Sequence, residues 1–227
     1  CRTRSSATDM LDRLQQQLSD TYQADPGYDV RDFLITDRRV AHAISGDNVL
    51  TAGGETLLVQ EHEEGLSMSL YLEAGILERL ESDDPLTSLR DEQLDDFCKV
   101  IEGLSHFNYV AWRASRDRSM SLLELELQAE VDKFVSTMQL ALHQGDNELL
   151  NGLYARLFND IALRPELDDE QSERYRAATE FAARFCRGLR RRMLEKGDVA
   201  LPELRRFFRL PLGEKISHIN TRALSSA

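Results

Sequence analysis

Apolar positions in the second part of the chain recur at the three- and four-residue intervals of an amphipathic α-helix. From Pro85 onward this spacing is interrupted at glycine and proline residues, so it predicts a succession of helices that pack through their apolar faces. We expect these helices over residues 91–115, 121–143, 147–160, 169–196, 203–208 and 213–220.

Several helix ends are marked by residues that commonly cap helices. Ser88 and Ser121 each begin a four-residue segment with the spacing of a capping box, and the pair Asp168–Asp169 supplies another cap. Gly145 predicts the end of the helix that follows Ser121. Residues 122–128 also alternate like a strand, but the long helical pattern after them favours a helix.

The first part of the chain has a less regular pattern. A short helix capped by Asp9 is expected, with Asp25–Gly27 as the turn that follows it. A second helix is expected over residues 31–44.

One β-hairpin is expected within residues 55–72. Its strands are predicted at 55–62 and 66–72, because in the second run apolar side chains alternate with Ser67, Ser69 and Tyr71. We expect the serine and tyrosine face to be solvated and the opposite face to be buried. An isolated hairpin is marginal in water, so it should pack on helices or join a further strand, for which residues 49–51 are a candidate. The buried face consists of Leu66, Met68, Leu70 and Leu72.

These elements predict a mainly α (α+β) fold, a helical bundle with a small N-terminal β-hairpin element. We expect an α/β element over residues 1–87 and a bundle over 88–227, joined in one continuous domain. A chain of 227 residues is long enough to bury a substantial core. It contains no run approaching the ~20 apolar residues that cross a bilayer, so no transmembrane segment is expected.

Charge is distributed unevenly. The chain carries a net charge of −12, but residues 171–227 carry an excess of basic side chains. Such asymmetry is a hint of a charged partner, and the alternative is that the two parts attract each other within one fold. The cysteines are too few and too scattered for a disulfide framework, which favours free thiols and a cytoplasmic location. Cys1 leaves two interpretations open, a processed lipoprotein terminus and a fragment start.

Standard catalytic and cofactor motifs are absent from the sequence. There is no HExxH, CxxC, GxSxG, phosphate loop or GxGxxG, and none of the five histidines has a glutamate three residues before it. The last point disfavours a ferritin-like di-metal site. We therefore expect no cofactor, and the sequence leans away from an enzyme without deciding the question.

A stripe of polar residues is predicted along the helix over 91–115. Glu102 and His106 lie one turn apart and can hydrogen-bond, while Tyr109 and Arg113 on the next turns could supply a proton donor and an anion clamp. These four are the candidate catalytic residues. The complete stripe consists of Asp95, Lys99, Glu102, His106, Tyr109 and Arg113.

A metal site is the sharper hypothesis for the same region. Glu126, Glu130 and Lys133 share one face of the next helix, and if that face meets the stripe, His106, Glu126 and Glu130 could surround a hard cation or a water molecule. The alternatives are that both stripes are solvated helix faces, or that His106 has only a structural hydrogen-bonding role. Charged helix faces are common and metal sites rare, which favours a structural role.

Arginines of the last helices form a second candidate site. They could bind a partner or an anion, and their proximity to aromatic residues resembles a surface that follows a nucleic-acid backbone. The acidic character of the whole chain, with a pI near 4.9, argues against nucleic acid. The candidates are Arg184, Arg187, Arg190, Arg191 and Arg206.

Three functions follow in order of preference. The first is a non-enzymatic, regulatory or scaffolding protein that works by binding a protein partner or by self-association. The second is a metal- or acid/base-dependent enzyme centred on Glu102 and His106. The third is a nucleic-acid binder that uses the C-terminal arginines.

Overall fold

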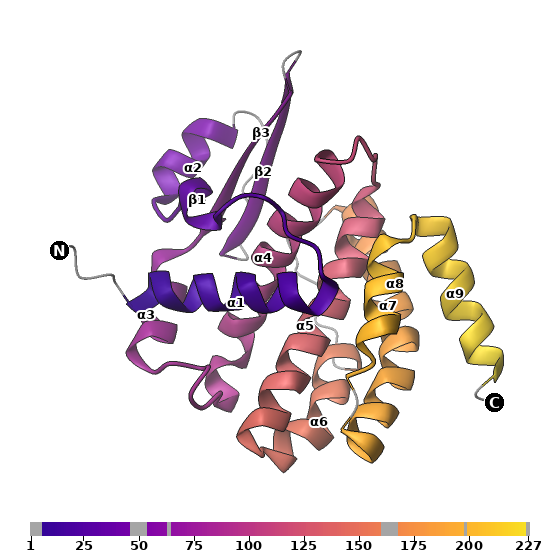
Figure 1. The fold of residues 1–227 in the computed structure, drawn as a ribbon. Coiled ribbons are helices and arrows are strands. Elements are labelled where there is room, and N and C mark those ends of the chain that lie inside the picture. The colour runs from indigo at the N-terminus through magenta and orange to yellow at the C-terminus, as the bar shows by residue number, and fades with distance from the viewer. Residues whose placement is uncertain (1–5, 46–53, 63–64, 160–167, 198, 226–227) are drawn as a thin grey trace.

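A computed structural model of the protein describes residues 6–45, 54–62, 65–159, 168–197 and 199–225 (Figure 1). Helices account for most of these residues and one small sheet accompanies them, which confirms the expected fold class. The helices are α1 (Ser6–Tyr22), α2 (Arg38–Ser45), α3 (Ala74–Ser82), α4 (Leu94–Ala114), α5 (Leu122–Gln144), α6 (Asn147–Phe158), α7 (Asp169–Lys196), α8 (Leu201–Arg209) and α9 (Leu212–Ser225). The strands are β1 (Leu34–Ile35), β2 (Glu55–His62) and β3 (Gly65–Leu72), and single 3-10 turns are η1 (Val30–Phe33) and η2 (Asp91–Gln93).

The expected hairpin is present and is extended by a third strand. β2 and β3 pair antiparallel, and β1 pairs parallel with β3, which gives the order β1-β3-β2. One face of the sheet packs on α4, and α2 lies against the other face (Figure 1). The expectation that Tyr71 lies on a solvated face is wrong, because Tyr71 packs with Ala41 of α2 and is 1% exposed.

The predicted helix over 31–44 is also wrong in its first half. Residues 30–33 form η1, Leu34–Ile35 form β1, and only then does α2 begin, with the Asp37 side chain accepting a hydrogen bond from the Arg39 amide at 2.8 Å. Pairing with β3 decides the conformation of β1, and that partner is distant in sequence. The candidate strand at 49–51 lies outside the described residues.

Three helix starts differ from the sequence-based expectations. Helix α1 begins at Ser6, so Asp9 lies in its first turn and does not cap it. In place of the capping box expected at Ser88, the Gln93 side chain accepts a hydrogen bond from the Arg90 amide at 3.0 Å, at the start of η2 that leads into α4. Helix α3 was not expected at all.

Other helix ends agree with the capping residues. The Ser121 hydroxyl accepts a hydrogen bond from the Glu124 amide at 3.2 Å, and Gly145 ends α5 with a φ of 69°. Asp168 caps α7 through a reciprocal capping box with Gln171. Local sequence therefore sets these boundaries.

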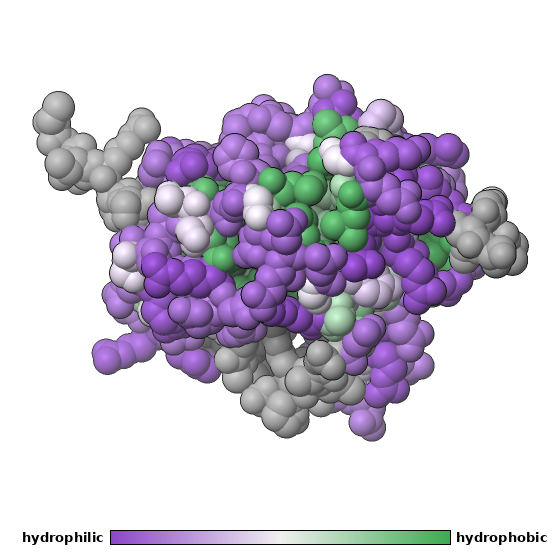
Figure 2. All heavy atoms as spheres, turned by 90° about the horizontal axis from the view of Figure 1, so that it is seen from below, coloured by the Kyte–Doolittle hydropathy of each residue, from purple (hydrophilic) through white to green (hydrophobic). Residues whose placement is uncertain are grey.

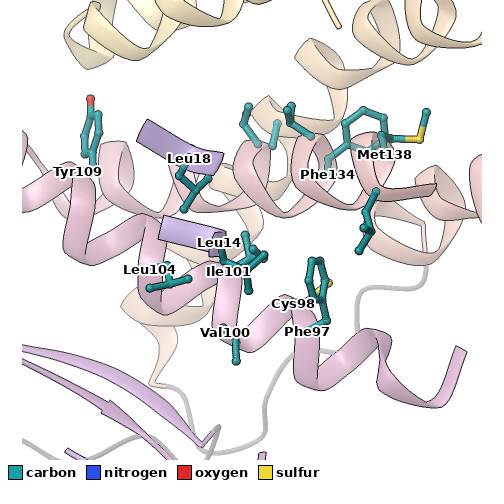
Figure 3. Packing of buried hydrophobic residues seen from close by; sticks show 14 of the residues in the cluster. Leu14, Leu18, Phe97, Cys98, Val100, Ile101, Leu104, Tyr109, Phe134 and Met138 are labelled. Carbon is teal, nitrogen blue, oxygen red and sulfur yellow. The ribbon is translucent and has the colours of Figure 1, made fainter. Parts of the chain in front are cut away.

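Helix α5 lies at the centre of the bundle, where it packs against α4, α6 and α7. Figure 3 shows that leucines of α1 and apolar side chains of α4 lie together beside α5. The buried residues Trp112 and Cys98 belong to this core, as does Cys186 of α7.

The apolar cluster also joins the beginning of the described chain to its last part. Helix α1 packs against α8, with the rings of Tyr22 and Phe208 stacked at 4.4 Å. Arg205 of α8 donates to the Thr21 carbonyl at 3.1 Å, and Arg209 donates to the Gln23 carbonyl at 3.0 Å. The end of α1 is therefore held by α8.

Within the described part of the chain, none of the helices combines the length and the apolar character needed to cross a bilayer. On the face shown in Figure 2, hydrophilic residues surround a band of apolar ones.

Candidate functional site

The polar stripe of α4 enters the interior of the protein after its first two turns. Asp95 is exposed, but Glu102 is 4% exposed, His106 6% and Arg113 3%. The expectation that the stripe is a solvated helix face is therefore wrong for this stretch. The physical reason is that the sheet and α5 both pack against α4 and cover it.

The sheet contributes a carboxylate to this region. Glu55 is the first residue of β2 and lies on the sheet face that packs against α4, opposite Leu72 in the ladder. Gly103 makes the close approach possible, since a Cβ there would meet Glu55 Cγ and Leu70 Cδ1, each at 3.0 Å. The missing side chain lets Glu55 reach the helix one turn before His106.

His106 lies between two carboxylates. Its Nδ1 is 3.4 Å from Glu55 Oε1, and its Nε2 is 3.5 Å from Glu126 Oε2 of α5. The Nε2 atom is buried and has no hydrogen-bond partner among the described residues. Burial opposes a charge on the ring, but Glu126 and Glu55 together outweigh it and raise the pKa of His106 well above its usual value.

A second ion-pair group lies on the other side of Glu102. Lys133 Nζ is 3.2 Å from Glu102 Oε2 and 2.7 Å from Glu130 Oε1. Burial would lower the pKa of Lys133, but the two carboxylates raise it well above its usual value. Lys133 is thus an ammonium ion held inside the protein.

The region holds more acid than base. The carboxylates of Glu55, Glu102, Glu126 and Glu130 act on one another, and Lys133 and His106 are positively charged partners among them. Burial raises the pKa of Glu55 and of Glu130, although His106 and Lys133 respectively oppose this. Buried negative charge is costly unless it is balanced, so the region favours the uptake of positive charge as protons or as a metal ion.

Donor atoms of three residues lie close enough together to be candidate ligands of one metal ion. One donor atom each from Glu102, His106 and Glu126 lies within 4.8 Å of the others. Two donors bound to one ion at typical bond lengths are roughly 3.0–3.4 Å apart. The 3.5 Å between His106 Nε2 and Glu126 Oε2 is close to that separation and long for a hydrogen bond. Glu55 lies beside Nδ1 of His106, the ring atom that does not face Glu126. In metal sites, a carboxylate at this position commonly orients the metal-bound histidine.

Tyr109 and Arg113 belong to a different cluster. The Tyr109 hydroxyl donates to Glu124 Oε1 at 2.5 Å, and Arg113 pairs with the same oxygen. The other oxygen of Glu124 accepts from the Leu212 amide at the start of α9, at 3.1 Å. The structure places these side chains in a buried contact that holds α9, away from the His106 group.

A buried lysine extends this second cluster. Lys215 of α9 donates to Gln128 Oε1 at 2.6 Å, and the Gln128 amide donates to Asp132 at 3.0 Å. Asp132 also accepts from Ser105 at 2.5 Å and from the Tyr22 hydroxyl. Burial lowers the pKa of Lys215 to about 7.

Sequence reasoning did not include Glu55, Lys215 or Asp132 among the candidates. Glu55 had a usable signal, because it shares its strand face with Leu57 and Val59 and so is in phase with apolar residues. No sequence pattern marks Lys215, since the side chains around it come from α4, α5 and α8.

The C-terminal arginines differ in their contacts. Arg184 donates to the Asn220 side chain, and Arg190 donates to the Asn151 carbonyl at 3.2 Å, so both bridge helices. Arg187, Arg191 and Arg206 are exposed.

A comparison with family models, with curated proteins and with solved structures finds no match to this chain.

Proposed function

We propose that the protein binds a divalent transition-metal ion through Glu102, His106 and Glu126 and that the ion supports catalysis. The observation that carries this proposal is the buried Nε2 of His106, which has no hydrogen-bond partner among the described residues and faces Glu126 at 3.5 Å. A set of one imidazole and two carboxylates suits ions such as Mn²⁺, Fe²⁺ or Zn²⁺.

The number of protein ligands supports a catalytic rather than a purely structural ion. Structural zinc sites are closed by four protein ligands, whereas catalytic sites use three and keep a position for water or substrate. Among the residues that the structure describes, Glu102, His106 and Glu126 supply three donors. An ion there would act as a Lewis acid, and Glu55 would hold the His106 ring in the orientation that presents Nε2.

Metal analysis of the purified protein, followed by calorimetric titration with Mn²⁺ and with Zn²⁺, tests the proposal. The wild type should bind one of these ions, and His106→Gln and Glu126→Gln should each abolish binding. Glu55→Gln should weaken it by about 10–100-fold, the usual effect of losing a carboxylate that orients a ligand. Glu148→Gln, which changes an exposed carboxylate of α6, is the matched control. Binding that persists unchanged in both ligand variants would refute the proposal.

Protein binding and nucleic-acid binding remain predictions from the sequence, as does a cytoplasmic location. The large apolar side chains exposed in the described part of the chain are spread over several elements, so they do not favour a particular partner. They are Tyr28, Val40, Ile44, Val59, Leu122 and Leu194. For nucleic acid, a gel shift that weakens steeply with salt is the expected signature, and the absence of retardation at low salt would contradict it.

A further inference from the structure

Glu102 takes part in two neighbouring groups of side chains. On one side it belongs to the donor set with His106 and Glu126. On the other side its Oε2 is 3.2 Å from the Lys133 ammonium, which also contacts Glu130 at 2.7 Å. One carboxylate thus lies between a candidate metal position and a buried positive charge.

A two-metal site is one model for this arrangement. In such sites two ions are about 3.5–4 Å apart and act together on the same reacting group. Here the Lys133 ammonium faces Glu102 and Glu130, both of which are buried. Carboxylates in these positions would be ligands for a second ion if the ammonium were absent.

We propose that Lys133 is a built-in cation that fills a second metal position between Glu102 and Glu130, so that the protein takes up one metal ion and not two. This inference rests on the proposed metal site at His106. The competing explanation is that Lys133 only neutralises two buried carboxylates and that no metal position exists on its side of Glu102.

Counting bound Mn²⁺ tests the inference, because free Mn²⁺ is measured directly by its solution EPR signal. The wild type should bind one ion per chain, and Lys133→Met, which keeps the apolar stem and removes the charge, should bind two. The double variant Lys133→Met/Glu130→Gln should return to one. Lys99→Met is the matched control, since Lys99 pairs with exposed Asp95 one turn along α4, and it should bind one.

The outcomes separate this inference from the proposed function. One ion in both the wild type and Lys133→Met would overturn the inference and leave the His106 site in place. Two ions in the wild type would overturn it as well, because Lys133 would then exclude nothing. If the wild type binds neither Mn²⁺ in this assay nor Zn²⁺ in the calorimetric titration, the proposed site and this inference are refuted together. If circular dichroism shows that Lys133→Met does not fold, Lys133→Gln, which keeps a donor for the carboxylates, provides the same count.

Discussion

Lys215 should make the stability of the protein depend on pH in a way that one substitution removes. Burial lowers the pKa of this lysine from 10.5 to about 7 in the folded state. Between these values the unfolded chain binds more protons than the folded one, so the free energy of unfolding rises with pH. From pH 7 to pH 9 the contribution of Lys215 should be about 2 kcal/mol, since a full unit of pKa shift corresponds to about 1.4 kcal/mol.

Urea unfolding followed by far-UV circular dichroism at pH 7, 8 and 9 measures this contribution. The wild type and Lys215→Met share all other titrating groups, so the difference between their pH slopes reports the titration of Lys215 together with its effect on Asp132, whose pKa Lys215 lowers. We expect the variant to lack about 2 kcal/mol of the rise seen in the wild type. Its absolute stability is less informative, because Lys215→Met also leaves Gln128 Oε1 without its donor.

A control variant separates this effect from the loss of one positive charge. Lys196→Met changes an exposed lysine in the last turn of α7 and should keep the wild-type slope. If the curves of the wild type and Lys215→Met run parallel from pH 7 to pH 9, the conclusion that Lys215 is a buried, easily deprotonated amine is wrong.

Three further substitutions test the packing. Gly103→Val should destabilise the protein by about 2 kcal/mol and weaken metal binding, because the new side chain would displace Glu55; thermal unfolding and metal titration measure the two effects. Ser121→Ala should cost about 1 kcal/mol in urea unfolding, since the Glu124 amide at the start of α5 loses its acceptor, and an unchanged midpoint would contradict this. Phe134→Ala should cost about 3–5 kcal/mol in the same assay because Phe134 is fully buried, and a loss below 1 kcal/mol would show that the core closes around the cavity.

Much of the fold could be predicted from the sequence where local chemistry decides. Ser121, Gly145 and Asp168 act through neighbouring backbone groups, so their positions identify helix ends correctly. The segment 31–44 could not be assigned in this way, because Leu34–Ile35 are extended through pairing with β3. The periodicity of a segment carries no information about a strand, distant in sequence, with which that segment will pair.

The candidate site also shows that contacts between segments distant in sequence cannot be predicted from local patterns. The spacing of Glu102 and His106 and that of Glu126 and Glu130 are visible in the sequence, and the structure brings these residues together. Their burial was not predictable, because polar residues at helical spacing usually mark a solvated face. The cover over His106 includes Glu55, which comes from a strand that begins far upstream.

The contact between α1 and α8 has a consequence for the order of events during synthesis. Arg205 and Thr21 are separated by 184 positions, so the apolar side of α1 that receives Phe208 stays uncovered until residues 201–209 have left the ribosome. Contacts of such long range slow folding, because the chain between them must be brought together first. The contact between α1 and α8 therefore forms late during synthesis. Until it forms, the side of α1 that α8 covers is exposed to chaperones.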